Sequence, residues 1–171
     1  VDRASARKIR RDVVIEPVSK SGDHPVYLAP HLFVRAHYRH MLTRQFTEVK
    51  AEAPVDVLHL TAPLPLRMKG VKRVVTIHDL IPLRLPHTTP DNKAEFVGRA
   101  RTCARESNLV ITVSQTSKAD IVALLDVDPA KIAVTYQPSD LRPLSREEVE
   151  RMPAGLWRFG LTPGNYLLSV G

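Results

Sequence analysis

Short runs of consecutive apolar residues recur along the chain from residue 55 onwards, and stretches with helical periodicity separate them. The runs are rich in β-branched residues, which is typical of strands buried on both faces of a parallel sheet. The sequence predicts four such strands, over residues 55–60, 73–77, 109–113 and 131–136. Because strands and helices alternate, we expect an α/β fold with a parallel sheet and right-handed crossovers.

Two amphipathic helices are predicted between these strands, over residues 92–107 and 115–125. Apolar side chains at spacings of three and four share one face of each helix. They are Phe96, Ala100, Cys103 and Ala104 in the first helix, and Ala119, Val122 and Ala123 in the second. Ser114 precedes the second helix at the position of an N-cap, and Asp128-Pro129 predicts a turn after it.

The N-terminal part shows a weaker pattern. Residues 12–18 favour a strand, residues 21–23 favour a turn, and residues 31–50 favour one long helix. The apolar residues on or near one face of that helix are Leu32, Val34, Tyr38, Leu42 and Phe46. The opposite face would carry Arg35, Arg39 and Arg44.

Composition places the chain among globular proteins. Its 171 residues are 43% hydrophobic and 25% charged, which suits one α/β domain with a real core. The single cysteine, Cys103, argues against a disulfide framework or a cysteine-based zinc site, and for a reducing compartment. No apolar run approaches the ~18 residues of a membrane span, and no secretory signal is evident. We therefore expect a cytoplasmic location.

Positive charge is concentrated at the N-terminal end. The net charge is +7, and residues 1–50 hold ten Lys and Arg against five Asp and Glu. Such a patch attracts polyanions, although a solvated basic tail is the simpler interpretation of Arg3, Arg7, Lys8, Arg10 and Arg11. The basic residues are not interleaved with aromatic residues, which argues against a nucleic-acid-binding protein.

Candidate chemistry lies where the predicted strands end. His78 and Asp79 follow the strand at 73–77, and ligands of open α/β sheets bind beyond the carboxyl ends of strands. An imidazole can donate and accept a hydrogen bond at once, as a sugar hydroxyl requires. The residues are equally compatible with a structural role, in which His78 satisfies a buried carbonyl and Asp79 caps a turn.

Other polar residues give weaker signals. His59 ends a strand and could line the same cleft or only pack, and Ser114 is mainly a cap that could also contact a substrate. His37 and His40 have the spacing of a metal pair, but no carboxylate or cysteine is near them in the sequence, so we expect a solvated helix face and no metal. Cys103 repeats the apolar spacing and is expected in the core.

Five segments carry a family resemblance in their order and spacing. They are residues 56–61, 76–82 with the sequence Thr-Ile-His-Asp-Leu-Ile-Pro, 111–118, 127–132 and 166–171. Together they resemble the retaining glycosyltransferases of the family-four, glycogen-synthase-like group, which have two facing Rossmann-like domains in the GT-B arrangement. The resemblance covers roughly residues 55–171. The glycine-rich turn with which the family begins has no counterpart before residue 55.

The resemblance implies a division of the chain. Residues 1–54 would be a poorly matched N-terminal segment of the first domain, and residues 55–164 its Rossmann-like, acceptor-side part. Residues 165–171, which look like a strand that ends abruptly at a glycine, would begin a truncated C-terminal donor-binding domain. On this interpretation these 171 residues carry at most half an active site and would be inactive alone.

The resemblance also implies an activity: transfer of a sugar from a nucleotide-sugar donor to a hydroxyl acceptor, a glycan or a lipid-linked one, with retention of configuration. No cofactor is implied beyond the nucleotide-diphosphate sugar, which is a substrate. His78 would be the catalytic contact to the donor sugar, with Asp79, His59 and Ser114 as substrate contacts. The alternative is a non-catalytic sugar- or nucleotide-binding α/β module.

The basic helix adds one expectation about partners. Arg35, Arg39 and Arg44 would contact the acceptor or the inner face of a membrane, because anionic headgroups attract clustered arginines. Peripheral attachment to that membrane is therefore expected beside the cytoplasmic location. In the competing interpretation, the helix packs its apolar side onto the sheet and leaves the arginines merely solvated.

Overall fold

A computed structural model describes most of the chain. The described residues are 13–21, 24–90, 92–138, 142–143, 145–151, 153–162 and 165–167. Contacts divide the chain into two compact units, Val1–Tyr136 and Gln137–Gly171. The first unit contains both sheets, and each unit is described by itself below.

The first sheet of this unit has the strand order β2-β1-β3-β5. β1 (Val13–Ser21) forms an antiparallel hairpin with β2 (His24–Leu28), whereas β3 (Thr47–Ala51) runs parallel to β1. The short strand β5 (Leu66–Arg67) is parallel to β3. The strand expected over residues 12–18 is therefore present, but its partner β2 was not predicted.

The second sheet has the order β4-β6-β7-β8 and is parallel throughout. Its strands are β4 (Val57–Leu60), β6 (Lys72–Thr76), β7 (Leu109–Thr112) and β8 (Ile132–Val134). These are the four strands that the apolar runs predict, so the expectation of a Rossmann-like parallel sheet flanked by helices is confirmed. Between residues 47 and 76 the chain alternates between the two sheets, because β3 and β5 belong to the first, and β4 and β6 to the second.

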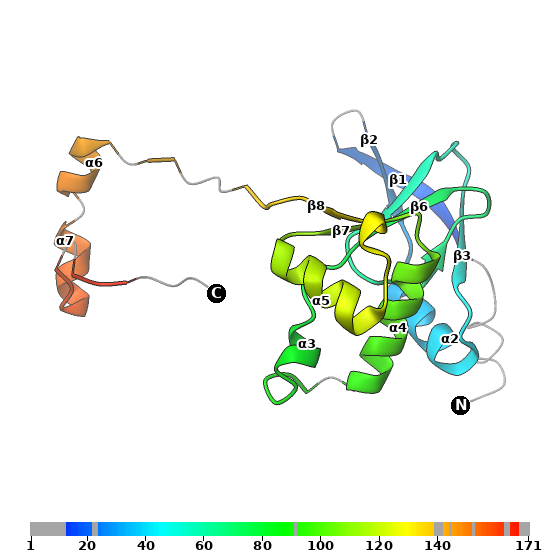
Figure 1. The fold of residues 1–171 in the computed structure, drawn as a ribbon. Helices are drawn as coiled ribbons and strands as arrows, with labels where there is room; N and C mark the ends of the chain where they lie inside the picture. The colour runs from blue at the N-terminus through cyan, green and yellow to red at the C-terminus, as the bar shows by residue number, and fades with distance from the viewer. Residues whose placement is uncertain are drawn as a thin grey trace. The chain divides into compact units, whose positions relative to one another are not determined.

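Helices cover the second sheet. α4 (Lys93–Glu106) and α5 (Gln115–Leu125) lie side by side against β6 and β7 (Figure 1). The one-turn helix α3 (Ile81–Arg84) follows β6, and a 3-10 turn, η1 (Pro129–Lys131), precedes β8. Large side chains buried between these layers are Val75, Ile77, Leu80, Val110, Ile121, Leu125 and Ile132.

The two main helices differ in how well the sequence predicts their buried face. In α4, Ala100, Cys103 and Ala104 are buried as expected. In α5 the expected buried face is right only for Val122, which packs against the core, since Ala119 and Ala123 are exposed. The buried residues of α5 are Ser117, Asp120, Ile121 and Leu125. This face buries larger apolar side chains than an alanine face would.

The long helix expected over residues 31–50 is wrong in its second half. α2 spans Leu32–Thr43, and the next residue, Arg44, has a left-handed φ of 58°. The chain then enters β3, where Thr47 pairs with Leu66, so pairing with strands distant in sequence overrides the local helical pattern. Arg44 therefore lies beyond the helix rather than on its face.

The face of α2 that meets the core is only partly the one expected. Ala36 and His40 are buried, and Leu32 packs against the core from the same stripe, at a spacing of four. Tyr38 and Leu42 are instead 48% and 63% exposed. The expectation that His40 lies on a solvated face is thus wrong, because its ring turns inward.

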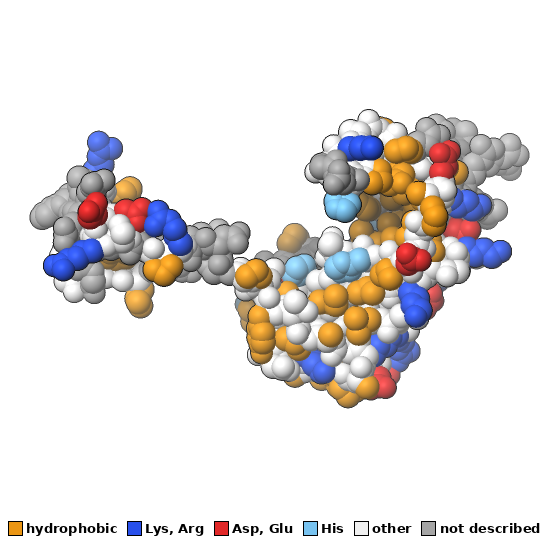
Figure 2. Space-filling view, turned by 90° about the horizontal axis from the view of Figure 1, so that it is seen from above, with side chains coloured by type: hydrophobic (Ala, Val, Ile, Leu, Met, Phe, Trp, Pro, Cys, Tyr) orange, Lys and Arg blue, Asp and Glu red, His pale blue; other side chains and the backbone are white. Residues whose placement is uncertain are grey.

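Exposed apolar side chains are concentrated between residues 13 and 42. They are Val14, Val18, Val26, Leu28, Phe33, Val34, Tyr38, Met41 and Leu42, which we call the N-terminal apolar surface. Figure 2 shows hydrophobic side chains gathered on the surface of this unit next to a hollow. Exposed apolar side chains on the hairpin of β1 and β2 and on α2 offer area for contact with another molecule.

The second unit contains two short helices, α6 (Arg146–Arg151) and α7 (Pro153–Leu156), and a 3-10 turn, η2 (Trp157–Phe159). Glu148 accepts hydrogen bonds from Arg142 and from the Ser145 amide, which lower the pKa of this carboxyl to about 2. Of the strand expected over residues 165–171, the described part, 165–167, is not in a strand, and residues 168–171 lie outside the described residues.

Candidate functional site

The segment His78–Asp79 lies just beyond the carboxyl end of β6. The Ile77 amide donates to the Ile111 carbonyl at 2.9 Å, which continues the pairing with β7. Ile77 and Leu80 are each 1% exposed, whereas the two residues between them are exposed. Two buried neighbours therefore hold a short exposed segment that carries an imidazole and a carboxylate.

Hydrogen bonds fix this segment on both sides. The Asp79 carboxylate accepts from the Ile81 amide at 3.0 Å, so it caps the start of α3. The Thr112 hydroxyl lies 3.5 Å from the His78 carbonyl, at the limit of a hydrogen bond. The capping role is the structural alternative named for Asp79 above, and the side chains of both His78 and Asp79 are exposed.

A cavity of about 170 Å³ opens beside this segment. It is lined by Ala62, Pro63, Ile77, His78, Asp79, Pro82 and Phe96. Most of this lining is apolar, and the polar side chains come from His78 and Asp79. Such a surface suits a ligand with an apolar face and hydroxyl groups at its edge.

His59 and Ser114 lie at the same edge of the second sheet and already make structural hydrogen bonds. The His59 Nε2 atom lies 2.8 Å from the Thr76 hydroxyl, so this bond links β4 to β6. The Ser114 hydroxyl accepts from the Ser117 amide at 3.0 Å, which confirms its expected position as the N-cap of α5. Their contact with a substrate stays a prediction.

An ion pair that the sequence analysis missed lies next to this segment. Arg84, the last residue of α3, donates through Nε to the Asp120 carboxylate at 2.9 Å, and through Nη2 to the same oxygen. The two residues are 36 positions apart, so no local pattern indicates the pair. It connects the segment after β6 to the helix after β7.

The three arginines expected at a membrane or acceptor lie near α2. Arg35 and Arg39 are partly buried, and Arg44 is exposed. Arg39 donates to the Gln45 side chain at 3.3 Å. A cavity of about 330 Å³ is lined by Arg39, Arg44, Gln45, Phe46, Arg67 and Glu106. The structure thus places two of the three expected arginines, Arg39 and Arg44, at one cavity with Arg67, which was not predicted.

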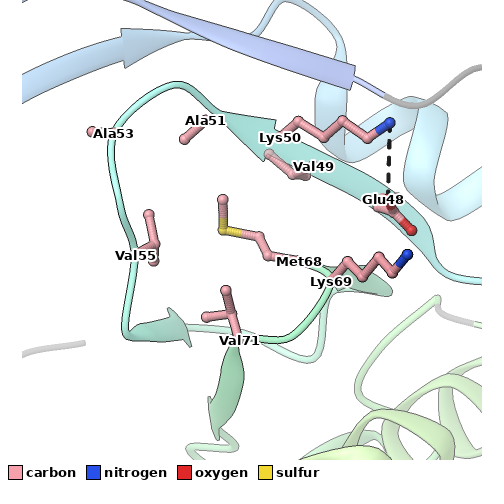
Figure 3. A pocket seen from close by; sticks show the side chains of 9 residues that line it. All are labelled: Glu48, Val49, Lys50, Ala51, Ala53, Val55, Met68, Lys69 and Val71. Carbon is pink, nitrogen blue, oxygen red and sulfur yellow. Dashed lines mark ion pairs between the residues drawn. The ribbon is translucent and has the colours of Figure 1, made fainter.

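A separate cavity of about 370 Å³ lies between β3 and the segments on either side of β4 and β5. Figure 3 shows Val49, Val55, Met68 and Val71 around it, with a Glu48–Lys50 ion pair of 4.0 Å to one side. Its remaining lining residues are Ala51, Ala53 and Lys69. The cavity has an apolar centre and contains none of the expected site residues.

The two histidines of α2 lie in different surroundings. His37 lies 3.6 Å from Glu95 of α4, and His40 is buried with neither ring nitrogen hydrogen-bonded. Burial, followed by the charge of Arg44, lowers the pKa of His40 below 6.5. No group of three or more metal-ligating side chains occurs within the described part of the chain.

Cys103 packs in the core, as its spacing predicts. Its side chain is 1% exposed, and burial raises the pKa of the thiol to about 12. A thiol of this kind does not act as a nucleophile at neutral pH.

A protein-family model matches most of the chain. The family model described as Glycosyltransferase Family 4 matches residues 3–142, a range that begins upstream of the first motif recognised at residue 56. No curated protein matches the chain. Every helix among the described residues is too short or too polar to cross a lipid bilayer.

Proposed function

The chain belongs to glycosyltransferase family 4, and on this premise we propose that it supplies the acceptor-side half of a retaining glycosyltransferase. The observation that carries the proposal is the family match over residues 3–142 together with His78 and Asp79, which lie at a cavity beyond β6. The donor would be a nucleotide-diphosphate sugar and the acceptor a hydroxyl of a glycan or a lipid-linked glycan, and no further cofactor is proposed.

In the proposed reaction, the bond between the anomeric carbon and the diphosphate oxygen breaks, and a bond to the acceptor oxygen forms on the same face. The proton of the acceptor hydroxyl passes to the departing phosphate oxygen. Positive charge develops on the sugar meanwhile, so groups fixed beside it lower the barrier. His78 would contact the sugar as this charge develops, through its ring or its carbonyl oxygen, and the apolar lining would exclude water.

The test compares His78→Ala with His24→Ala in β2, a histidine that does not line the cavity. In the full protein, His78→Ala should raise the activation free energy by roughly 2–4 kcal/mol, which lowers kcat about 30- to 1000-fold. The donor KM should change less. His24→Ala should leave both constants unchanged. Release of nucleoside diphosphate from a panel of donors measures the rate, and NMR of the product gives its anomeric configuration.

Failure of the wild-type protein to turn over any donor, in the presence of glycan and lipid-linked acceptors, would favour the non-catalytic binding module. Equal rates for His78→Ala and wild type would leave His78 with a structural role, or with a contact through its backbone alone.

We also propose that the enzyme acts at the cytoplasmic face of a membrane. The observation in favour is that the N-terminal apolar surface includes Tyr38 and Leu42 of α2, while Arg39 and Arg44 lie close by on the same segment. An amphipathic helix with basic residues beside an exposed apolar face suits an anionic bilayer. In the competing arrangement this apolar side packs inward, and of the residues expected on it Leu32 packs against the core and Phe46 is buried.

A further inference from the structure

The one-turn helix α3 directly follows the His78–Asp79 segment and cannot be stable by itself. It has four residues, and an isolated helix of that length is far below the size at which helices form in water. Its first turn is capped by Asp79, and Leu80, immediately before it, is buried. At its far end, Leu83 packs against the core, and a polar interaction adds to this packing.

Arg84 supplies that interaction. Two of its guanidinium nitrogens donate to the same carboxylate oxygen of Asp120, on the second turn of α5. The Asp120 side chain is only 10% exposed, whereas that of Arg84 is 58% exposed. A nearly buried carboxylate gains more from a fixed cation than a solvated one, so loss of Arg84 leaves a poorly solvated charge behind.

The pair spans two neighbouring strand ends. β6 and β7 are adjacent in the second sheet, His78 follows β6, and Ser114 follows β7 at the start of α5. A link between α3 and α5 ties the segment after β6, which lines the cavity, to the helix after β7, and so bears on the spacing between the two. Displacement of a catalytic group by about 1 Å can cost 100-fold in rate, so this spacing bears on catalysis.

We propose that Arg84 and Asp120 are positioning residues, which hold the His78–Asp79 segment in place at the cavity. Their effect on turnover rests on the glycosyl transfer proposed above. Their effect on the segment does not, because its order can be measured without any reaction.

The experiment uses the full protein with Arg84→Ala and, as a second variant that preserves side-chain shape, Asp120→Asn. The matched control is Arg105→Ala, since Arg105 pairs with Asp126 at the other end of α5. Amide hydrogen exchange over residues 77–90 and steady-state kinetics are measured well below the melting temperature. Both site variants should speed exchange in this segment and lower kcat about tenfold or more, with KM within about twofold of wild type. The control should change neither.

Two results would overturn the proposal: unchanged exchange over residues 77–90 in a folded variant, or a similar change in Arg105→Ala. If Arg84→Ala does not fold, Asp120→Asn decides in the same way. If the wild-type protein transfers no sugar, the proposed reaction fails, and the exchange measurement alone still decides whether the pair holds the segment.

Discussion

The two sheets of the first unit differ in what covers them. The parallel sheet has α4 and α5 against it, and Val75, Val110, Ile121 and Leu125 lie buried between these layers. Near the first sheet, by contrast, β1, β2 and α2 expose valines, leucines and aromatic residues to solvent. Both regions contain many apolar residues, yet only one buries most of them within the described part of the chain.

The apolar residues of the two regions have different roles. In the parallel sheet, burial stabilises the fold and fixes the strand ends that carry His78 and Ser114. In the N-terminal region, apolar area stays available for a contact outside the unit, which is why we propose a membrane there. The helix starts differ in the same way, since Asn92 and Ser114 cap α4 and α5, whereas no side chain caps α2 at His31.

The largest expected difference concerns stability. Leu125→Ala, in the core of the parallel sheet, should lower the free energy of unfolding by about 2–5 kcal/mol, because it opens a cavity. Leu42→Ala, on the exposed face of α2, should change it by less than about 0.5 kcal/mol. Urea unfolding of both variants measures this. Equal losses would mean that the N-terminal apolar surface is buried in solution. The two regions would then not differ in how much apolar surface they bury.

Membrane binding should show a smaller effect, in the N-terminal region alone. Replacing Arg39 and Arg44 by glutamine should weaken binding to anionic vesicles roughly 30-fold, since each cation near such a surface contributes about 1 kcal/mol. Arg105→Gln, in α4, is the matched control. Sedimentation with vesicles of varied anionic content is the measurement. Equal binding to neutral and anionic vesicles, or none to either, contradicts the proposal.

Substitutions at the N-termini of α5 and α2 should change the free energy of unfolding in opposite directions, by about 1 kcal/mol or less. Ser114→Ala should lower the free energy of unfolding by about 1 kcal/mol, because the Ser117 amide loses its acceptor. His31→Gly should raise it by less than about 1 kcal/mol, since His31 has a left-handed φ of 57° that glycine adopts without strain. Thermal melts of both variants give the signs. A loss in His31→Gly would show that this side chain has a stabilising contact.

The smallest expected effect is on the pH dependence of the free energy of unfolding, through His40. Because the pKa of His40 is lowered in the folded state, the unfolded chain takes up this proton first as the pH falls below 6.5. The stability from the neutral, buried ring is therefore complete above pH 6.5 and is lost as the pH falls toward the folded-state pKa. The charged groups that act on the ring are Arg44 and Arg99, which favour the neutral form, and Glu95 and Glu106, which oppose them.

His40→Leu should flatten this part of the pH–stability curve. Denaturant unfolding at several pH values between 7.5 and 5 compares the slopes. An unchanged slope in His40→Leu would assign the pH dependence to other groups. That outcome would also weaken the distinction between a buried inner face and an exposed outer face of α2.

The sequence predicts the parallel sheet well because its signals are local. Consecutive apolar residues predict β4, β6, β7 and β8, and Ser114 predicts the start of α5. The prediction fails where pairing with strands distant in sequence determines the local structure. Residues 47–51 look helical, yet they pair with β1 and β5. Which face of α2 turns inward also depends on the core that it meets, and alanine and histidine at positions 36 and 40 give no such indication.

The candidate site likewise has residues that the sequence predicts and residues that it does not. The position of His78 and Asp79 follows from the strand before them, and the family resemblance points to the same residues. The lining residues Ala62 and Phe96, and the Arg84–Asp120 pair, come together only through the order of strands in the sheet. Their roles in a reaction stay predictions.

The alternation of β3, β4, β5 and β6 between the two sheets has a consequence for how this region is made and reused. During synthesis, β4 leaves the ribosome before β5 can complete the first sheet, and the second sheet waits for β8. Neither sheet corresponds to one continuous stretch of chain, so no single cut separates them into fragments that could fold alone. A graft of the His78 cavity into another protein would therefore have to carry both sheets together.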